Sequence, residues 1–283
     1  MASIAHLSDL HFGCHDPVVV AGLEQLLFER RPDLVVISGD FTQRARSSQF
    51  QLACRFIARI EDAGLKVLAV PGNHDVPLYD ILRRFVRPLH RYRRYISDDL
   101  CPWWENDELA MLGINTARSM TIKDGSISHD QLRRIREAFD AGTRGKLRIL
   151  VTHHPLLAMP IGEDGKAEGG VNRSNHALAA AAEANVDLLL AGHFHRSFSR
   201  SARDLVANVG PSLVVQAGTA TSTRLRGGEC QSFNWIEAHR DGIQIWVNSW
   251  QDGAFRAGEP ARFLFDGANW HDAGDGTAAE QAA

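Results

Sequence analysis

Polar side chains that can bind metals follow five short apolar runs of the sequence. Carboxylate, imidazole and amide groups occur at these positions, and no cysteine is among them. Such oxygen and nitrogen ligands suit divalent transition metals. The five clusters are Asp9-Leu10-His11, Gly39-Asp40, Gly72-Asn73-His74-Asp75, Thr152-His153-His154-Pro155 and Gly192-His193-Phe194-His195. The sequence therefore predicts a metal site assembled from several segments.

Two of the clusters place metal-capable residues two positions apart. In an extended segment such residues point the same way, so Asp9 and His11 can bind one ion, and so can His193 and His195. Each cluster alone has an ordinary structural explanation, such as a helix-capping aspartate or a turn that bends at Gly72. Their joint occurrence after predicted strands favours a functional site.

The elements that must position these clusters are short strands alternating with helices. Apolar runs of the kind found in strands buried on both faces occupy residues 4–8, 34–37, 67–70, 111–114, 147–151, 186–191 and 212–217. Apolar residues at helical spacing, or alanine-rich composition, predict helices over 17–30, 45–63 and 176–184. This alternation predicts an α/β fold, in which sites form at the carboxyl edge of the sheet.

The last third of the chain has a different pattern. Residues 233–238 and 243–250 alternate apolar and polar side chains around Asp241-Gly242, which predicts an antiparallel hairpin in a second sheet. Residues 266–283 are rich in Gly, Ala and Asp and are expected to form a flexible tail. No internal repeat or long linker interrupts residues 1–265, which predicts a single domain.

Composition narrows the function classes. The 283 residues are 44% hydrophobic and 23% charged, which suits one large globular domain. A net charge of −3 does not indicate a general nucleic-acid binder. The sequence has no apolar run of about 20 residues and no N-terminal signal pattern, so a cytoplasmic protein with no membrane partner is expected. The four cysteines are scattered and are expected to be free thiols.

Taken together, the five clusters resemble the ordered motifs of the calcineurin-like metallophosphoesterases. The resemblance spans roughly residues 4–196 and is closest to the bacterial branch of cyclic-nucleotide and broad-specificity phosphodiesterases. It implies a four-layer α-β-β-α sandwich, in which two packed mixed sheets are flanked by helices. It also implies two divalent metal ions, which could be Mn, Fe, Zn or Co.

The resemblance assigns a role to each motif residue. The implied metal ligands are Asp9, His11 and His195 for one ion, Asn73, His153 and His193 for the other, and Asp40 for both. His74 would face the substrate and protonate the leaving group, since histidine titrates near neutral pH. Asp75 would orient His74 from behind.

The implied reaction is hydrolysis of phosphodiesters by attack of a metal-activated water or hydroxide. Small phosphodiesters, including 3′,5′-cyclic nucleotides, are the expected substrates. One alternative is an enzyme with the same site that acts on phosphomonoesters or, as a nuclease, on nucleic acid. Nucleic acid is less favoured as a partner than a small phosphodiester. Another alternative is a non-catalytic scaffold of the same fold. The complete ligand set disfavours the scaffold, because relatives of that kind typically lack ligands.

The residues that would contact the substrate are less well determined. Candidates near strand ends are Arg44, Asn115, His154, Arg224 and Arg226. For each arginine, a solvated or ion-paired surface role is the alternative.

Residues 83–94 contain six arginines around Pro88, which should interrupt the helix there. This segment is either a solvated face or a surface for an anionic partner. A homo-oligomer is a further alternative, since relatives in this branch are often oligomeric.

Overall fold

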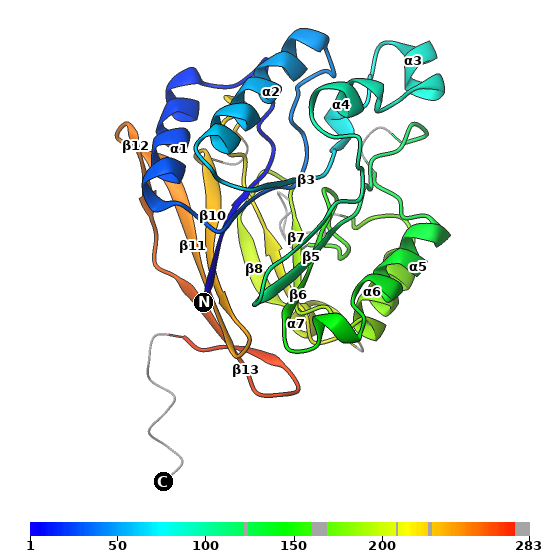
Figure 1. Ribbon diagram of the computed structural model, residues 1–283, viewed down its shortest axis with the longest axis vertical. Helices are drawn as coiled ribbons and strands as arrows, with labels where there is room; N and C mark the ends of the chain where they lie inside the picture. Colours follow the sequence, from blue (N-terminus) through cyan, green and yellow to red (C-terminus); the bar gives the residue numbers. More distant parts are fainter. Residues whose placement is uncertain (122–123, 160–168, 208, 226–227, 275–283) are drawn as a thin grey trace.

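The computed structural model describes residues 1–121, 124–159, 169–207, 209–225 and 228–274. Two β-sheets pack face to face, and helices cover the outer face of each (Figure 1). This arrangement is the four-layer α-β-β-α sandwich that the family resemblance implied, so that prediction is confirmed.

The first sheet contains the N-terminal strands and the C-terminal hairpins. Its order is β14 (Trp270–Asp272), β13 (Ala261–Phe265), β11 (Gly242–Gln251), β10 (Ser232–His239), β1 (Ala2–Leu7), β2 (Leu34–Ile37) and β3 (Val67–Ala69), with β12 (Ala254–Ala257) paired to β11. Strands β1, β2 and β3 run parallel, whereas β10 pairs with β1 in the antiparallel sense. The sheet is therefore mixed.

The second sheet has the order β4 (Trp103–Glu105), β5 (Leu109–Gly113), β6 (Leu147–Val151), β7 (Leu188–Ala191), β9 (Leu213–Gln216) and β8 (Phe198–Ser201). Its four central strands are parallel, and β4 and β8 are antiparallel edges. Parallel strands end at the same edge, so the loops after β6 and β7 emerge side by side.

The helices divide between the two outer faces (Figure 1). Helices α1 (Pro17–Arg30) and α2 (Ser47–Asp62) cover the first sheet, and α4 (His90–Tyr95) packs on α2. Helices α5 (His129–Ala138) and α6 (Ser174–Glu183) cover the second sheet, and α7 (Ala202–Leu205) follows β8. Helix α3 (Ile81–Val86) stands at the periphery, and short 3₁₀ turns form η1 (Asn73–Asp75) and η2 (Ala141–Thr143).

Three apolar layers explain why the strand sequences are continuous apolar runs. In β2, Leu34 and Val36 face the second sheet, whereas Val35 and Ile37 face helices α1 and α2. Because both faces are covered, every residue of this strand is buried. The same double burial in β6 and β7 holds the ends of these strands rigidly against each other.

The structure also contains elements that the sequence pattern did not reveal, among them the strands β4, β8, β12, β13 and β14 and the helices α5 and α7. Strand β14 lies in the segment that was expected to be a tail, and its Trp270 is buried in the apolar layer between the two sheets. Residues 275–283 lie outside the described part of the chain. As expected, Pro88 separates α3 from α4.

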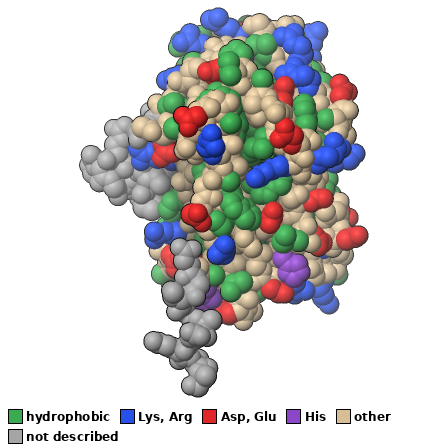
Figure 2. All heavy atoms as spheres, turned by 90° about the vertical axis from the view of Figure 1, so that its left-hand side faces the viewer, with side chains coloured by type: hydrophobic (Ala, Val, Ile, Leu, Met, Phe, Trp, Pro, Cys, Tyr) green, Lys and Arg blue, Asp and Glu red, His purple; other side chains and the backbone are tan. Residues whose placement is uncertain are grey.

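Three further properties of the described residues bear on the function: the surface charge, the lengths of the helices and the state of the cysteines. Basic and acidic side chains are interspersed on the face shown in Figure 2, in keeping with the small net charge. Within the described residues, no helix has the length and apolar character needed to cross a bilayer. All four cysteines are free.

Candidate metal centre

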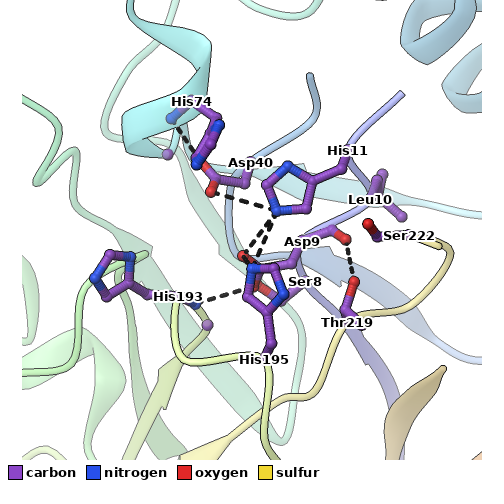
Figure 3. Close-up of polar contacts among 12 residues, drawn as sticks. Ser8, Asp9, Leu10, His11, Asp40, His74, His193, His195, Thr219 and Ser222 are labelled. Atoms are coloured by element: carbon purple, nitrogen blue, oxygen red, sulfur yellow. Dashed lines mark hydrogen bonds and ion pairs between the residues drawn. The ribbon is translucent and has the colours of Figure 1, made fainter. Parts of the chain in front are cut away.

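Five strand ends meet where the two sheets lie against each other. The loops after β1, β2 and β3 bring in the clusters that begin at Asp9, Asp40 and Asn73. The loops after β6 and β7 bring in those that begin at His153 and His193. Figure 3 shows how several of these side chains converge from different strands. The site predicted from scattered clusters is therefore one constellation.

Five of the predicted ligands have left-handed backbone conformations. The residues and their φ angles are Asp9 (52°), His11 (47°), Asp40 (55°), His193 (82°) and His195 (61°). Non-glycine residues rarely adopt this conformation, and such strain clusters at functional sites. The expectation that Asp9 and His11 point the same way holds, although these loops are coiled rather than extended.

The first ligand set consists of Asp9, His11 and His195. The Nε2 atoms of the two histidines lie 3.1 Å apart, and Asp9 Oδ1 lies 3.5 Å from His11 Nε2 and 3.1 Å from His195 Nε2. All three residues are buried, and Asp9 Oδ1 has no hydrogen-bond partner among the described residues. Three ligand atoms thus converge on one point.

The second ligand set consists of Asn73, His153 and His193. Asn73 Oδ1 lies 3.0 Å from His153 Nε2 and 3.1 Å from His193 Nδ1. Asp40 Oδ2 lies between the two sets, 3.4 Å from His153 Nε2 and 3.7 Å from His11 Nε2. This position suits the bridging role that the family resemblance implied for Asp40.

Two glycines are required because other groups come close to their α-carbons. A Cβ atom on Gly72 would lie 2.1 Å from Asp40 Oδ1, and one on Gly39 would lie 2.5 Å from His153 Nδ1. Gly39 also has a φ of 98°, as expected for a sharp turn. Gly72 has a φ of −105°, so it is needed for the close approach of Asp40 and not for the bend predicted from the sequence.

Electrostatics show that the cluster requires positive charge. Burial would raise the pKa of Asp9 and Asp40, but neighbouring histidines, chiefly His195 and His153 respectively, hold both values below the usual range. Burial would lower the pKa of His153, but Asp40 raises it to about 9. Burial, with a contribution from His153, lowers the pKa of His193 to about 3. Two buried carboxylates thus demand cations.

The tautomer of His153 further fits metal binding. Its Nδ1 lies 2.8 Å from the backbone carbonyl oxygen of Ser38, which can only accept a hydrogen bond. Nδ1 therefore carries the proton, and Nε2 faces Asp40 and Asn73. With nitrogen and oxygen ligands, an unsatisfied Asp9 oxygen and two buried carboxylates, the residues present fit a pair of divalent cations.

A layer of hydroxyl groups behind the first ligand set was missed by sequence reasoning. Thr219 Oγ1 donates to the backbone carbonyl of Asp9 at 2.7 Å, as Figure 3 shows, and Thr221 Oγ1 donates to that of Leu10 at 2.6 Å. Ser8 Oγ donates to Asp9 Oδ2 at 2.6 Å. No local pattern marks these threonines, because they lie more than 200 residues from Asp9.

His74 lies beside the metal ligands, but its partner is not the predicted one. Its ring meets that of His11 edge-on at 4.8 Å, and its backbone N–H donates to Asp40 Oδ1 at 2.8 Å. His74 Nδ1 lies 2.8 Å from the backbone carbonyl of Gln43, so Gln43 fixes the ring. No sequence pattern marks Gln43 beyond its place three residues after Asp40.

The prediction that Asp75 orients His74 is wrong. The Asp75 carboxylate accepts hydrogen bonds from the N–H groups of Phe41, Thr42 and Gly72 and from the hydroxyl of Thr42, at 3.0–3.2 Å. It therefore joins the loop after β3 to the loop after β2. Burial, and then the nearby Asp40, raise its pKa to about 7.

A pocket of about 420 Å³ opens in front of the centre. Its lining includes His11, Asn73, His74 and His195 from the centre, together with Gln43. Two of the predicted substrate contacts, Arg44 and Arg224, also line this pocket, as do the apolar side chains of Leu78, Tyr79 and Leu225. The Arg44 guanidinium stacks over the Tyr79 ring, 5.5 Å from its centroid.

The other predicted substrate contacts lie elsewhere. Asn115 borders a separate cavity, and its Oδ1 accepts from the N–H of Ala117 at 2.9 Å. His154 is buried behind His193, with ring centroids 4.6 Å apart, and its Nδ1 lies 2.8 Å from Thr116 Oγ1. His154 therefore supports His193 and does not face the pocket. Arg226 lies outside the described residues.

Comparisons with known proteins agree with this geometry. A probable cyclic nucleotide phosphodiesterase of Synechococcus sp. is 25% identical over 207 residues, covering 69% of this chain and 74% of the relative. The solved structures that share the fold include the following two. A dimetal phosphatase from Danio rerio has a TM-score of 0.64 at 11% identity and covers 93% of this chain and 99% of its own. Purple acid phosphatase from yellow lupin seeds has a TM-score of 0.68 at 13% identity, with coverages of 92% and 53%.

The match to the family is broad. The model of calcineurin-like phosphoesterases matches residues 2–197, a range that contains all seven predicted ligands and His74. The chain therefore belongs to the calcineurin-like phosphoesterase family.

Proposed function

We propose that this protein is a two-metal phosphodiesterase that hydrolyses small phosphodiesters, including 3′,5′-cyclic nucleotides. The observation that carries the proposal is the convergence of two ligand sets that share Asp40, beside a His74 ring that meets the ring of His11 at 4.8 Å. Membership of a phosphoesterase family supports the reaction class. The name of the Synechococcus relative supports cyclic nucleotides as substrates.

The donor atoms suit manganese, iron, zinc or cobalt. Asp9, His11 and His195 would hold one ion, Asn73, His153 and His193 the other, and Asp40 both. Divalent cations supply charge stabilisation to a phosphoryl group and lower the pKa of water from about 15.7 toward about 7. Ser8, Thr219 and Thr221 keep the Asp9 loop in its strained conformation, so the ligands need not reorganise on binding.

The protein itself supplies a proton to the leaving group. The Gln43 carbonyl accepts the Nδ1 proton of His74, which leaves Nε2 of the imidazolium as the proton donor. As hydroxide, formed from water that has lost a proton to solvent, bonds to phosphorus, the ester P–O bond breaks, and its electron pair takes the His74 proton. The products are an alcohol and a phosphomonoester, which are groups of a single molecule when the diester is cyclic. An acid of this kind contributes roughly 10²–10⁴-fold.

The pocket favours a diester over a monoester. Arg44 and Arg224 place positive charge around the anionic group, whereas Leu78, Tyr79 and Leu225 form an apolar lip. A diester carries two organic substituents, and the second one needs a surface of this type. A monoester would present only one such group and a second negative charge.

Hydrolysis of bis(p-nitrophenyl) phosphate and p-nitrophenyl phosphate tests the proposal. The protein loaded with manganese should have the higher kcat/KM for the diester, and a chelator should abolish both activities. Cyclic AMP and cyclic GMP should be converted to the corresponding nucleoside monophosphates. A higher kcat/KM for the monoester would refute the diester preference, and no activity with either aryl ester would support the non-catalytic scaffold.

A further inference from the structure

Exposed apolar side chains gather beside the pocket. Six of the thirteen large apolar side chains that are exposed in the described residues lie between residues 78 and 86. They are Leu78, Tyr79, Ile81, Leu82, Phe85 and Val86, here called the α3 tip, and Leu82 is 78% exposed. Such a patch on a protein surface marks a docking site.

Helix α3 is inverted relative to an ordinary surface helix. Its Arg84 is buried and donates to the backbone carbonyls of Pro77, Ser119 and Thr121, whereas its apolar residues face solvent. Met120, between two of those carbonyls, is 83% exposed and adds another apolar side chain. Because Arg84 holds the helix in this orientation, the apolar exposure is built into the fold. Helix α3 also stands at an outer corner of the molecule (Figure 1).

The same segment is strongly basic. Residues 81–94 contain six arginines and no carboxylate, although the whole chain has a net charge of −3. Asp80, just before α3, pairs with Arg83 at 2.6 Å, but Arg87, Arg93 and Arg94 are exposed. This segregation contrasts with the interspersed charges of the face in Figure 2.

A basic cavity opens between the end of α3 and the loop after β5. It encloses about 400 Å³, and Arg87, His90, Arg93 and Arg118 line it. None of the described lining residues is acidic. The Arg87 guanidinium and the His90 ring have no side-chain partner within the described part of the chain. The cavity is therefore suited to an anion such as a phosphate group.

We propose that the α3 tip docks on an anionic phospholipid surface. The apolar side chains insert between headgroups, and the basic cavity binds a lipid phosphate. Apolar burial combined with attraction to anionic lipids is the general basis of interfacial binding. This surface goes beyond the proposed hydrolysis and differs from the sequence-based expectation of no membrane partner. Leu78 and Tyr79 also border the active-site pocket, so docking places its mouth beside the lipid surface.

Charge and shape favour lipid over other occupants. In a two-fold dimer through this surface, the basic segment of one copy would face that of the other, and the two would repel. Four of the six α3-tip side chains, Leu78, Ile81, Leu82 and Val86, are aliphatic and cannot stack on bases. The Tyr79 ring already lies under Arg44, so only Phe85 remains to stack, which disfavours nucleic acid. The projecting tip suits insertion into a bilayer, and an acidic protein partner remains for the experiment to exclude.

Flotation of the full chain with vesicles tests the proposal. One set of vesicles contains equal amounts of phosphatidylglycerol and phosphatidylcholine, and the other contains phosphatidylcholine alone. The partition coefficient should be about tenfold or more higher for the anionic vesicles, and it should fall when NaCl is raised from 0.1 to 0.5 M. Equal partitioning into both sets of vesicles would overturn the proposal. Absence of partitioning would also overturn it, and is the result expected if the surface binds only an acidic protein.

Matched variants locate the surface. The double variant Leu82→Ser/Phe85→Ser and the double variant Arg87→Gln/Arg93→Gln should each reduce partitioning about tenfold. Leu264→Ser, on β13 at a side chain that is 58% exposed, should leave it unchanged. Hydrolysis of bis(p-nitrophenyl) phosphate without vesicles should persist in all three variants, so failure of docking is separable from failure of the proposed function.

Unchanged flotation of both double variants would overturn the proposal. A dimer in sedimentation equilibrium that dissociates in Leu82→Ser/Phe85→Ser would also overturn the proposal, because it would assign the surface to a second copy of the chain.

Discussion

The Nδ1 atom of His74 lies 2.8 Å from the backbone carbonyl oxygen of Gln43. A carbonyl oxygen can only accept, so the ring is held with Nδ1 protonated and with its other nitrogen available to the pocket. The contact joins the loop after β3 to the loop after β2. The orientation of the candidate acid is thus set by the same pair of loops that supply Asp40 and Asn73.

Removing His74 should separate proton donation from metal binding. His74→Ala should retain its metals but lose roughly 10²–10⁴-fold in kcat on cyclic AMP, whose leaving group is an alkoxide. The loss should be much smaller with bis(p-nitrophenyl) phosphate, because p-nitrophenolate leaves without a proton. Steady-state kinetics and metal analysis together check this.

Asp40→Ala provides the contrast, since it should lose both metals and both activities. Equal losses on the two substrates in His74→Ala would show that His74 does not act as the acid.

Adding a methyl group at Gly72 should disrupt the centre. The new Cβ would lie 2.1 Å from Asp40 Oδ1 and 2.3 Å from the backbone nitrogen of Asp40, which is shorter than any real contact. Gly72→Ala should therefore displace Asp40 and lower manganese affinity by at least about tenfold. Gly169→Ala is the control, because nothing lies within 4 Å of its added Cβ. Calorimetric titration would contradict the account if both variants bound manganese like the unchanged protein.

Thr219 should act on metal affinity through the Asp9 backbone. Thr219→Val leaves the Asp9 carbonyl without its 2.7 Å donor and should cost about 1–3 kcal/mol of unfolding free energy. It should also weaken manganese binding by roughly 10–100-fold, and Thr219→Ser should restore it.

Thr143→Val is matched to this change, since buried Thr143 donates to the carbonyl of Asp140 at 2.9 Å. Thr143 precedes β6, whereas His153 follows it, so the two lie at opposite ends of that strand. It should lose stability without losing metal affinity. An equal loss of affinity in both variants would reduce the role of Thr219 to general stability.

Much of the fold could be read from short-range pattern. Strands such as β2 and β6 are continuous apolar runs because both of their faces are covered, and this property is visible in the sequence. Helix α1 has the bounds predicted from its apolar spacing, and the structure shows that Asp16 caps its start, where Pro17 is the first residue. Edge strands such as β12 and β14 were missed because they are short and partly exposed.

The clusters that contain the ligands were predictable for a related reason, since each follows a buried strand, whereas the role of each ligand came from the family resemblance. The supporting contacts of the ligands were not predictable, because they join residues far apart in the chain. Gln43 acts through its backbone carbonyl, which no side-chain pattern reveals. The error at Asp75 has the same origin, since adjacency to His74 in the sequence suggested a contact that the turn does not allow.

The half-buried carboxyl of Asp187, remote from the centre, should make stability depend on pH. Burial raises the pKa of Asp187 to about 6, against the opposing hydrogen bond from the N–H of Arg148 at 2.8 Å. Between about pH 4 and pH 6 the folded protein keeps a proton that the unfolded chain has released. The contribution of this group to stability is therefore full below about pH 4 and is lost as pH rises through 6.

Asp187→Asn should remove that dependence, because an amide does not titrate. Its oxygen can still accept the hydrogen bond from the N–H of Arg148. Relative to the unchanged protein, the variant should gain up to about 3 kcal/mol of unfolding free energy between pH 4 and pH 7. Urea denaturation at several pH values measures the difference. A constant difference across this range would show that Asp187 ionises normally.

Titration of manganese into the metal-free protein, followed by hydrolysis of bis(p-nitrophenyl) phosphate, tests the two-metal claim most directly. Because Asp40 lies between both ligand sets, activity should rise with added metal and reach its plateau at two equivalents per chain. Full activity at one equivalent, or activity in the metal-free protein, would contradict the account.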